Sequence, residues 1–417
     1  MRISTVTMFE QSLNAMNRQQ GEFMKVGQQI ATGRRVVNPS DDPQASSRAV
    51  GVSQAKAVTQ QFADARVSAR NALSQSESVL NSVSDAVTSA KTLMVQASSD
   101  TLSDVDRQSV ASELRGIYET LIGQANATDG NGRYLFGGYQ DDAPPFARTG
   151  GEGVSGVAYN GDDKVREQRI DASRLMPATD NGLSIFQSVP SGAGYVARAE
   201  REDGARNEGA VTFTSGPNRV DPNAEGFGES LALRFETEGD GFRLKVADPA
   251  EPENDLYDET YLPGETISVA GISITLEGQP ADGDQIQVRP ANDPAANQDL
   301  FTSLKDAIDV LELDQQGTAE NRAHVRNTMN SVMRELDNSL DNVLTVRASV
   351  GARLNELDVV DSVAGNRMLN YEQTLSDLVD LDYAEAISDY SLRQVGLQAA
   401  QKTFVDIKGL SLFDYLR

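Results

Sequence analysis

The sequence contains no cysteine, and histidine occurs once among its 417 residues. The lack of cysteine excludes disulfide bonds, cysteine-based zinc sites and a cysteine nucleophile. His324 lies in a charged helical pattern without a partner at a metal-binding spacing, so we expect it to be a solvated surface residue. The acidic pairs at 141–142 and 162–163 are expected to be solvated turn residues. The sequence therefore predicts no metal site, no cofactor and no enzyme activity.

Long apolar runs are also missing. The mean hydropathy is −0.42, and no apolar run is long enough to cross a bilayer. The first residues, "MRISTVTMFEQSLNAM", have neither a continuous apolar region nor an A-x-A site. The sequence therefore predicts no membrane segment and no cleaved signal peptide.

Basic residues are scarce, since 37 Lys and Arg stand against 62 Asp and Glu, a net charge of −25. Residues 141–300 hold 30 of the acidic and 13 of the basic residues, so the middle of the chain carries most of the excess. This balance predicts a solvated acidic exterior and disfavours binding to nucleic acid.

Helical periodicity dominates both ends of the chain. One apolar stripe with three- and four-residue steps begins near residue 6, another spans 58–97, and a third spans 325–364. The middle instead has short alternating runs between Gly and Pro residues, which is the pattern of strands. We predict an α+β fold in which long helices from both chain ends form an antiparallel bundle around an inserted, mostly β outer domain.

The order of these patterns predicts five segments. The first two are an inner helix with an arm at 1–42 and the first part of a helical rod at 43–140. A β-rich outer domain, possibly two modules, follows at 141–296. The rod returns at 297–378, and a second inner helix follows at 379–417.

The stretch "ATGRRVVNPSDDPQASSRAV" at 31–50 separates the first helix from the second. Gly33 suits a left-handed helix end, and Pro39 forces the residue before it out of helical geometry. Asp42 suits an N-cap and Pro43 the first helical position. We predict a stop, a short extended arm and a restart, formed by Gly33, Arg35, Pro39, Ser40, Asp41, Asp42 and Pro43.

The two terminal helices carry more apolar surface than one helix pair can cover. An exposed apolar stripe marks a partner surface, so we predict self-assembly through both ends. The predicted interface comprises Val6, Phe9, Leu13, Met16, Phe23 and Ile30 at the N-terminal end. At the C-terminal end it comprises Ile387, Tyr390, Leu397, Phe404, Leu410, Leu412, Phe413 and Leu416. A closed monomeric bundle is the alternative.

Both ends of the chain resemble the bacterial flagellin and hook-associated family. "QQIATGRRVVNPSDDPQASSRAV" is similar to the family element I-x-T-G-[KR]-R-V…P-S-D-D-P, and "LDYAEAISDYSLRQVGLQAAQKTF" and "LSLFDYLR" are similar to its C-terminal signature. The matching residues of the first element are Ile30, Thr32, Gly33, Arg35, Val36, Pro39, Ser40, Asp41, Asp42 and Pro43. The resemblance covers about 1–145 and 297–417.

The resemblance implies a secreted structural adaptor of the flagellum that is exported without a cleaved signal. Its implied partners are further copies of itself in a ring-like assembly, an upstream hook-associated protein, flagellin and an export chaperone. Two alternatives remain open at this point. One is a flagellin filament subunit, and the other is a surface protein that binds glycans or a host through the β insert.

Overall fold

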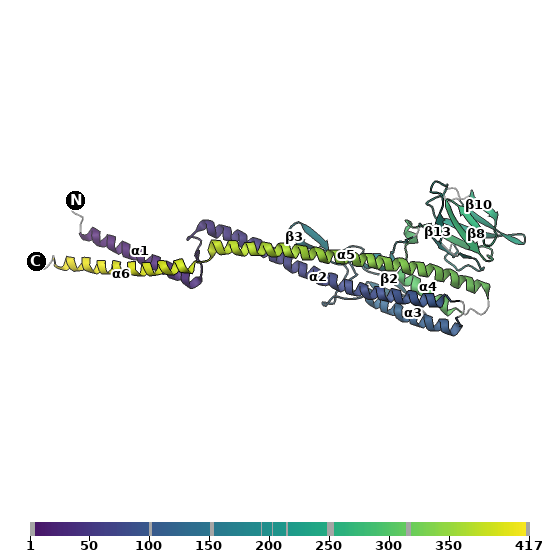
Figure 1. The fold of residues 1–417 in the computed structure, drawn as a ribbon, viewed down its shortest axis with the longest axis horizontal. Coiled ribbons are helices and arrows are strands. Elements are labelled where there is room, and N and C mark those ends of the chain that lie inside the picture. The colour runs from purple at the N-terminus through teal and green to yellow at the C-terminus, as the bar shows by residue number, and fades with distance from the viewer. Residues whose placement is uncertain are drawn as a thin grey trace. The chain divides into compact units, whose positions relative to one another are not determined.

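The computed structural model describes residues 5–99, 102–150, 154–192, 194–201, 203–213, 216–247, 254–313 and 318–413 (Figure 1). The chain divides into two compact units. The first unit comprises the described parts of Met1–Arg66 and Asp358–Arg417, and the second comprises those of Val67–Leu357. The long helices are α1 (Thr5–Thr32), α2 (Pro43–Ala97), α3 (Asp104–Ala125), α4 (Leu300–Glu312), α5 (Ala319–Val379) and α6 (Tyr383–Phe413).

In the first unit, helices α1 and α6 lie side by side and antiparallel (Figure 1). Phe23 of α1 contacts Tyr390 of α6. Where the two helices meet the rest of the chain, the N–H of Leu381, just before α6, donates to the carbonyl of Gly33, just after α1. The segments of α2 and α5 in this unit are also antiparallel. Lys56 pairs with Glu372 at 2.9 Å and, ten residues further along α2, Arg66 pairs with the earlier Asp361.

In the second unit, α2 and α5 are again antiparallel, and α3 and α4 pack with them around one apolar core. The predicted seam of α5 is confirmed, because Leu336, Ser339 and Val343 are fully buried. Leu80, Val83 and Val87 of α2 are equally buried in the same core. Each stripe buries one helical face because its apolar residues recur every three or four positions. The predicted antiparallel helical bundle with a β insert is therefore confirmed.

Helix ends in the second unit follow local capping rules. Ser103 caps α3 through a capping box, in which its hydroxyl accepts from the backbone N–H of Asp106 and the Asp106 carboxylate accepts from the N–H of Ser103. Asp299 caps α4 by accepting from the N–H groups of Phe301 and Thr302. Both caps satisfy N–H groups that a helix leaves without an internal partner.

The β insert contributes two hairpins and two larger sheets. One sheet has the antiparallel order β10-β9-β8-β13-β5, and β7 extends the other, β11-β12-β6, by pairing with β12. The hairpins are β1–β2 and β3–β4. The strands are β1 (Phe146–Thr149), β2 (Gly156–Tyr159), β3 (Glu167–Asp171), β4 (Arg174–Pro177), β5 (Tyr195–Arg198), β6 (Thr212–Phe213), β7 (Asn218–Arg219), β8 (Leu231–Glu238), β9 (Gly241–Ala247), β10 (Asp255–Thr260), β11 (Thr266–Val269), β12 (Ile272–Glu277) and β13 (Gln285–Pro290). Short π and 3₁₀ helices are η1 (Leu183–Gln187) and η2 (Pro294–Ala296).

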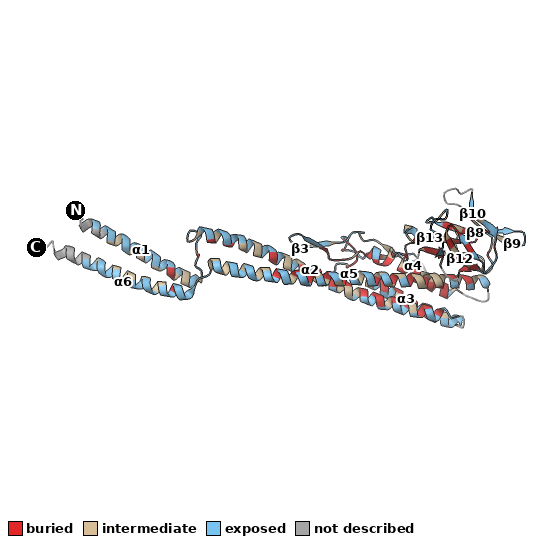
Figure 2. Ribbon diagram, turned by 45° about the horizontal axis from the view of Figure 1, so that its top comes forward, coloured by how far each residue is buried: buried red, intermediate tan, exposed pale blue. Residues whose placement is uncertain are grey.

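The two larger sheets share one apolar core and form a β sandwich (195–290). Alternate residues of β8 and β12 point into this core, which matches the two-residue period of a strand. The preceding part of the insert packs differently, since Phe146, Ile185 and Phe186 belong to the core of the helices. Figure 2 shows buried residues gathered in the sandwich and along α2 to α5 of this unit.

Four local expectations from the sequence are wrong. The stretch "RYLFGGY" (133–139), which the sequence predicts to be a short strand entering a loop, forms no strand and makes one bridge, from Tyr134 to Thr128. Asp141 is buried and forms an ion pair with Arg166 at 2.5 Å, since this loop folds back on the chain. Val58, expected in the helical seam, is 42% exposed. His324 is partly buried because it lines a cleft beside the β sandwich.

Candidate functional site: the arm and the terminal helix pair

The arm (residues 33–42) begins where α1 stops. Gly33 has a φ of 68°, the left-handed conformation that glycine adopts without a steric penalty. A Cβ atom at this position would lie 2.8 Å from the hydroxyl oxygen of Tyr383. Both the backbone angle and the close approach of α6 therefore require glycine here, and the predicted helix end is confirmed.

A tight turn forms the middle of the arm. The N–H of Asp41 donates to the carbonyl of Asn38 at 2.9 Å, with exposed Pro39 and Ser40 between them. The Asp41 carboxylate accepts from the N–H groups of Val37 and Asn38 at 3.2 and 2.8 Å. Lys25 of α1 pairs with the same carboxylate at 3.0 Å. One aspartate therefore fastens the turn to α1.

The next aspartate starts helix α2. The Asp42 carboxylate accepts from the N–H of Ala45 at 3.0 Å, and Pro43 is the first helical residue, so the predicted N-cap is confirmed. Arg35 reaches the same carboxylate at 3.3 Å. These contacts tie the two ends of the arm together.

Hydrogen bonds lower the pKa of both arm aspartates below 3.8. At Asp41 the largest cause is the backbone N–H of Asn38, followed by Lys25. At Asp42 it is the backbone N–H of Ala45, with Arg35 also contributing. Since the folded pKa values are depressed, the arm gains stability above the unfolded value and loses it as the pH falls below about 4.

The arm also pairs with the link between α5 and α6. The N–H of Arg35 donates to the carbonyl of Val379 at 2.8 Å, and its guanidinium donates to the carbonyl of Leu378 at 2.7 Å. In return, the N–H of Leu381 donates to the carbonyl of Gly33 at 3.0 Å. The break between α1 and α2 and the link between α5 and α6 are thereby fixed to each other.

The sequence reasoning did not identify several residues at this junction. Asp382 caps α6 by accepting from the N–H groups of Ala384 and Glu385. Tyr383 approaches Gly33, and Gln29 donates to the carbonyl of Arg35 at 2.6 Å. The signal for the cap was present in "LDYAE", where an aspartate precedes a glutamate by three residues, as in a capping box.

The terminal helices bring together part of the predicted interface. The rings of Phe23 and Tyr390 lie with centroids 4.6 Å apart, and Val26 and Ala386 are buried nearby. Ile387 is 54% exposed. The half-buried members of the predicted interface are Leu13, Met16, Phe23, Ile30, Tyr390, Leu397 and Phe404. The side chains of Val6, Phe9, Leu410, Leu412 and Phe413 are not described, and Leu416 lies outside the described residues.

Further apolar side chains are uncovered on the same two helices, where Figure 2 shows mostly exposed residues. Met24 of α1 is 62% exposed, and Leu392 and Val405 of α6 are 71% and 64% exposed. The sequence reasoning missed them because they fall outside the three- and four-residue stripe. A signal was nevertheless present in the sequence. These apolar residues lie beside a stripe that already faces a partner helix, so a further partner is needed to cover them.

Among the residues that the structure describes, no group of three or more His, Asp and Glu side chains is placed to hold a metal ion. None of the described helices is both long and apolar enough to cross a membrane.

A terminal helix pair with open apolar faces, long antiparallel helices and a β insert between them define a flagellin-like structural protein. The model of the bacterial flagellin N-terminal helical region matches residues 3–141. The chain is 34% identical to flagellar hook-associated protein 3 of Salmonella typhimurium LT2, over all of both chains. It is also 34% identical to the Escherichia coli K12 protein of that name, over 99% of each chain. The chain belongs to the family of flagellar hook-associated protein 3.

A solved structure agrees with this assignment. The crystal structure of Xanthomonas campestris FlgL matches with a TM-score of 0.66 and 28% identity. The match covers 78% of this chain and 99% of that one. The predicted family resemblance is therefore confirmed, and the chain is a component of the bacterial flagellum.

Proposed function

We propose that this protein is the adaptor that joins the hook of the flagellum to the flagellin filament. Full-length identity to hook-associated protein 3 favours this role over that of a filament subunit. A crystal structure from Legionella pneumophila that shares the fold is itself described as a flagellar junction protein. We also propose that the role is structural and involves no catalysis.

The observation that supports assembly through the chain ends is the uncovered apolar surface of the helix pair. Leu392, Val395 and Val405 of α6 are each more than 60% exposed, beside the half-buried residues of the predicted interface. Exposing several large apolar side chains on one helix is unfavourable unless a partner covers them. We propose that neighbouring copies cover them in a ring-like assembly. An upstream hook-associated protein would bind on one side of this ring and flagellin on the other.

The arm has a separate part in this proposal. Its turn, its capped helix start and its pairing with residues 378–381 hold the break between α1 and α2 in one conformation. A fixed break sets where the terminal pair emerges in each copy, so that all copies present the same apolar face. We propose that Gly33, Arg35, Pro39, Ser40, Asp41, Asp42 and Pro43 act as this spoke.

Export is a further part of the proposal. The family relationship supports secretion without a cleaved signal, with a chaperone holding the chain beforehand. A chain without cysteine forms no disulfide that would obstruct its passage in an unfolded state.

The direct experiment removes the gene from the bacterium that encodes it and images the cells by electron microscopy. We expect hooks without filaments and flagellin in the medium, with both effects reversed by the intact gene. Filaments of normal number on the deletion strain would contradict the adaptor role. If the deletion strain lacked filaments but kept its flagellin inside the cell, the protein would have an export function instead.

A further inference from the structure

A cleft of about 370 Å³ lies where the β sandwich meets α4 and α5. Strand β5 and the loop after it form one side of the cleft, and the two helices form the other. The polar lining includes Arg198, Arg206, Asp306, His324, Asn327 and Glu335. The cleft therefore opens at the joint that attaches the sandwich to the helices.

A buried ion pair holds the joint at one side of the cleft. The Glu335 carboxylate of α5 accepts from the guanidinium of Arg198 at 2.8 Å and from the hydroxyl of Ser303 at 2.5 Å. The Glu335 side chain is only 4% exposed, so this pairing is shielded from water. Removing Arg198 would leave the buried charge of Glu335 without this partner.

A second contact crosses the joint from Asn327 of α5. Its amide oxygen accepts from the backbone N–H of Phe213 at 3.2 Å, and its amide nitrogen donates to the carbonyl of Val211 at 2.8 Å. The N–H of Phe213 therefore loses its partner whenever the sandwich moves away from α5.

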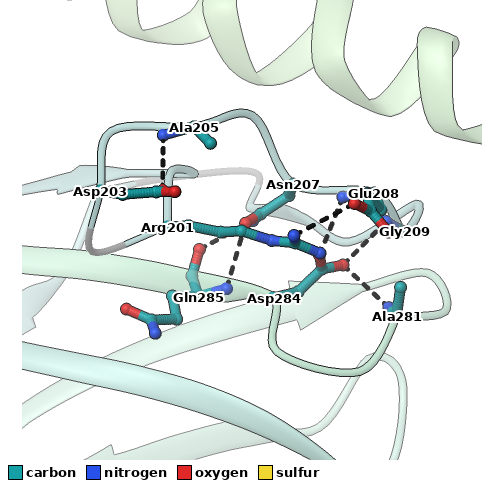
Figure 3. A network of polar contacts seen from close by, with 9 residues as sticks. All are labelled: Arg201, Asp203, Ala205, Asn207, Glu208, Gly209, Ala281, Asp284 and Gln285. Carbon is teal, nitrogen blue, oxygen red and sulfur yellow. Dashed lines mark hydrogen bonds and ion pairs between the residues drawn. The ribbon is translucent and has the colours of Figure 1, made fainter.

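The loop that carries Arg206 is fixed to the sandwich by a polar network (Figure 3). The fully buried Asp284 accepts from the N–H groups of Glu208, Gly209 and Ala281, each at 2.8 Å. Arg206 then donates to Asn321 of α5 at 2.7 Å. The loop is therefore bonded both to the sandwich and to α5, and the helices meet the sandwich through charged and polar side chains.

Asp306 of α4 lines this cleft. Among the described residues, no side chain forms a hydrogen bond or an ion pair with its carboxylate. Burial first, and then the negative charge of Glu335, raise the pKa of Asp306 to about 6, although Arg198 and Lys305 act in the opposite direction. Folding therefore makes the ionised form of Asp306 less favourable than it is in the unfolded chain.

Nine charged or titratable groups surround the cleft or contact its lining. The sandwich contributes Arg198, Glu200 and Arg206, α4 contributes Lys305, Asp306 and Asp309, and α5 contributes His324, Arg334 and Glu335. The arginines and the lysine stay charged between pH 5 and 7.5. Glu335 forms an ion pair with Arg198, and Asp309 forms one with Lys305 at 2.5 Å.

We propose that the joint is a pH-sensitive contact, weakened by the charge of Asp306 in neutral solution and tightened when that carboxylate takes up a proton. The folded pKa lies above the unfolded value of 3.8, so the stabilisation grows as the pH falls through about 6 and is complete below about 4. His324 opposes this change, because burial and Arg206 lower its pKa and its protonation is disfavoured in the folded state.

The test measures amide hydrogen exchange at Phe213 in the full chain at pH 7.5 and 5.0. Exchange rates are divided by those of the unfolded peptide at each pH. The main measurement uses the His324→Gln variant, because it lacks the group that opposes the effect of Asp306. Protection at Phe213 should be about tenfold greater at pH 5.0, as a shift of the Asp306 pKa to about 6 requires. In the native chain the increase should be smaller.

Two matched variants identify the group responsible. Adding Asp306→Asn should abolish the pH effect, whereas adding Asp341→Asn, at an exposed position of α5 that does not line the cleft, should leave it intact. The amide of Ala210, which donates to Gln279 within the insert, should change less than that of Phe213. A pH effect that survives Asp306→Asn, or unchanged protection at Phe213 in the His324→Gln chain, would overturn the proposal.

Discussion

At the scale of single residues, the arm depends on a few side chains with distinct tasks. Gly33 ends α1, Asp41 closes the turn and Asp42 starts α2. Each task follows from local backbone chemistry, since it satisfies an N–H group or permits a left-handed angle. These residues were predictable because their partners lie within a few positions in the chain.

We predict that Gly33→Ala destabilises the first unit by about 1 kcal/mol or more. The positive φ alone costs about this amount for a residue with a Cβ atom, and the hydroxyl of Tyr383 must also shift. Urea unfolding followed by circular dichroism would measure the change.

Gly51→Ala is the matched control for this prediction. Gly51 lies inside α2 with open space around it, so alanine should stabilise the helix by about 1 kcal/mol. Opposite signs for the two variants are expected. If both substitutions stabilised the protein, Gly33 would not be needed for the helix end.

Other residues escaped prediction because their surroundings are assembled from distant parts of the chain. Asp141 is buried and pairs with Arg166, and His324 is partly buried where it lines the cleft beside the β sandwich. Neither burial has a local sequence pattern. The pairing of Arg35 with residues 378–379 likewise joins positions more than 340 residues apart.

At the scale of elements, the helical stripes specify the bundle. Leu336 is fully buried in the seam, and Lys91 of α2 pairs with Asp337 beside it. The stripes were predictable because a helical face repeats along the sequence. The strand order was not, because β13 pairs with both β5 and β8 across long intervening segments.

We predict that Leu336→Asp lowers the free energy of unfolding of the second unit by more than about 3 kcal/mol, since it removes a buried side chain and buries a charge. Leu344→Asp on the same helix is the control, because Leu344 is 43% exposed and should tolerate the change. Calorimetry of both variants measures the difference. Equal melting of the two proteins would contradict the seam.

The insert offers a second prediction at this scale. We propose that the outer domain at 141–296 contains two modules, of which the sandwich has its own core. A fragment of 190–293 should therefore unfold cooperatively in urea.

The longer fragment, 140–295, should in addition bind a hydrophobic dye. Phe146 and Phe186 pack against the helices in the full chain and would be uncovered in that fragment. A disordered 190–293 fragment would mean that the helices are required to fold the sandwich.

At the scale of the whole molecule, the sequence predicted the family and the bundle, while the interface stays a prediction. The resemblance resided in short terminal motifs, and full-length identity confirmed it. The residues that contact neighbouring copies belong to an assembly, and one chain shows only that Leu392, Val395 and Val405 are uncovered.

Deleting residues 404–417 tests the central claim that the terminal helix pair joins hook and filament. In one strain, the measurement combines secreted protein, melting of the purified monomer and the number of filaments per cell. We predict normal secretion, a largely unchanged main melting transition and loss of filaments, since the deletion spares the α2–α5 seam and the sandwich. A truncated protein that still supports filaments would contradict the account.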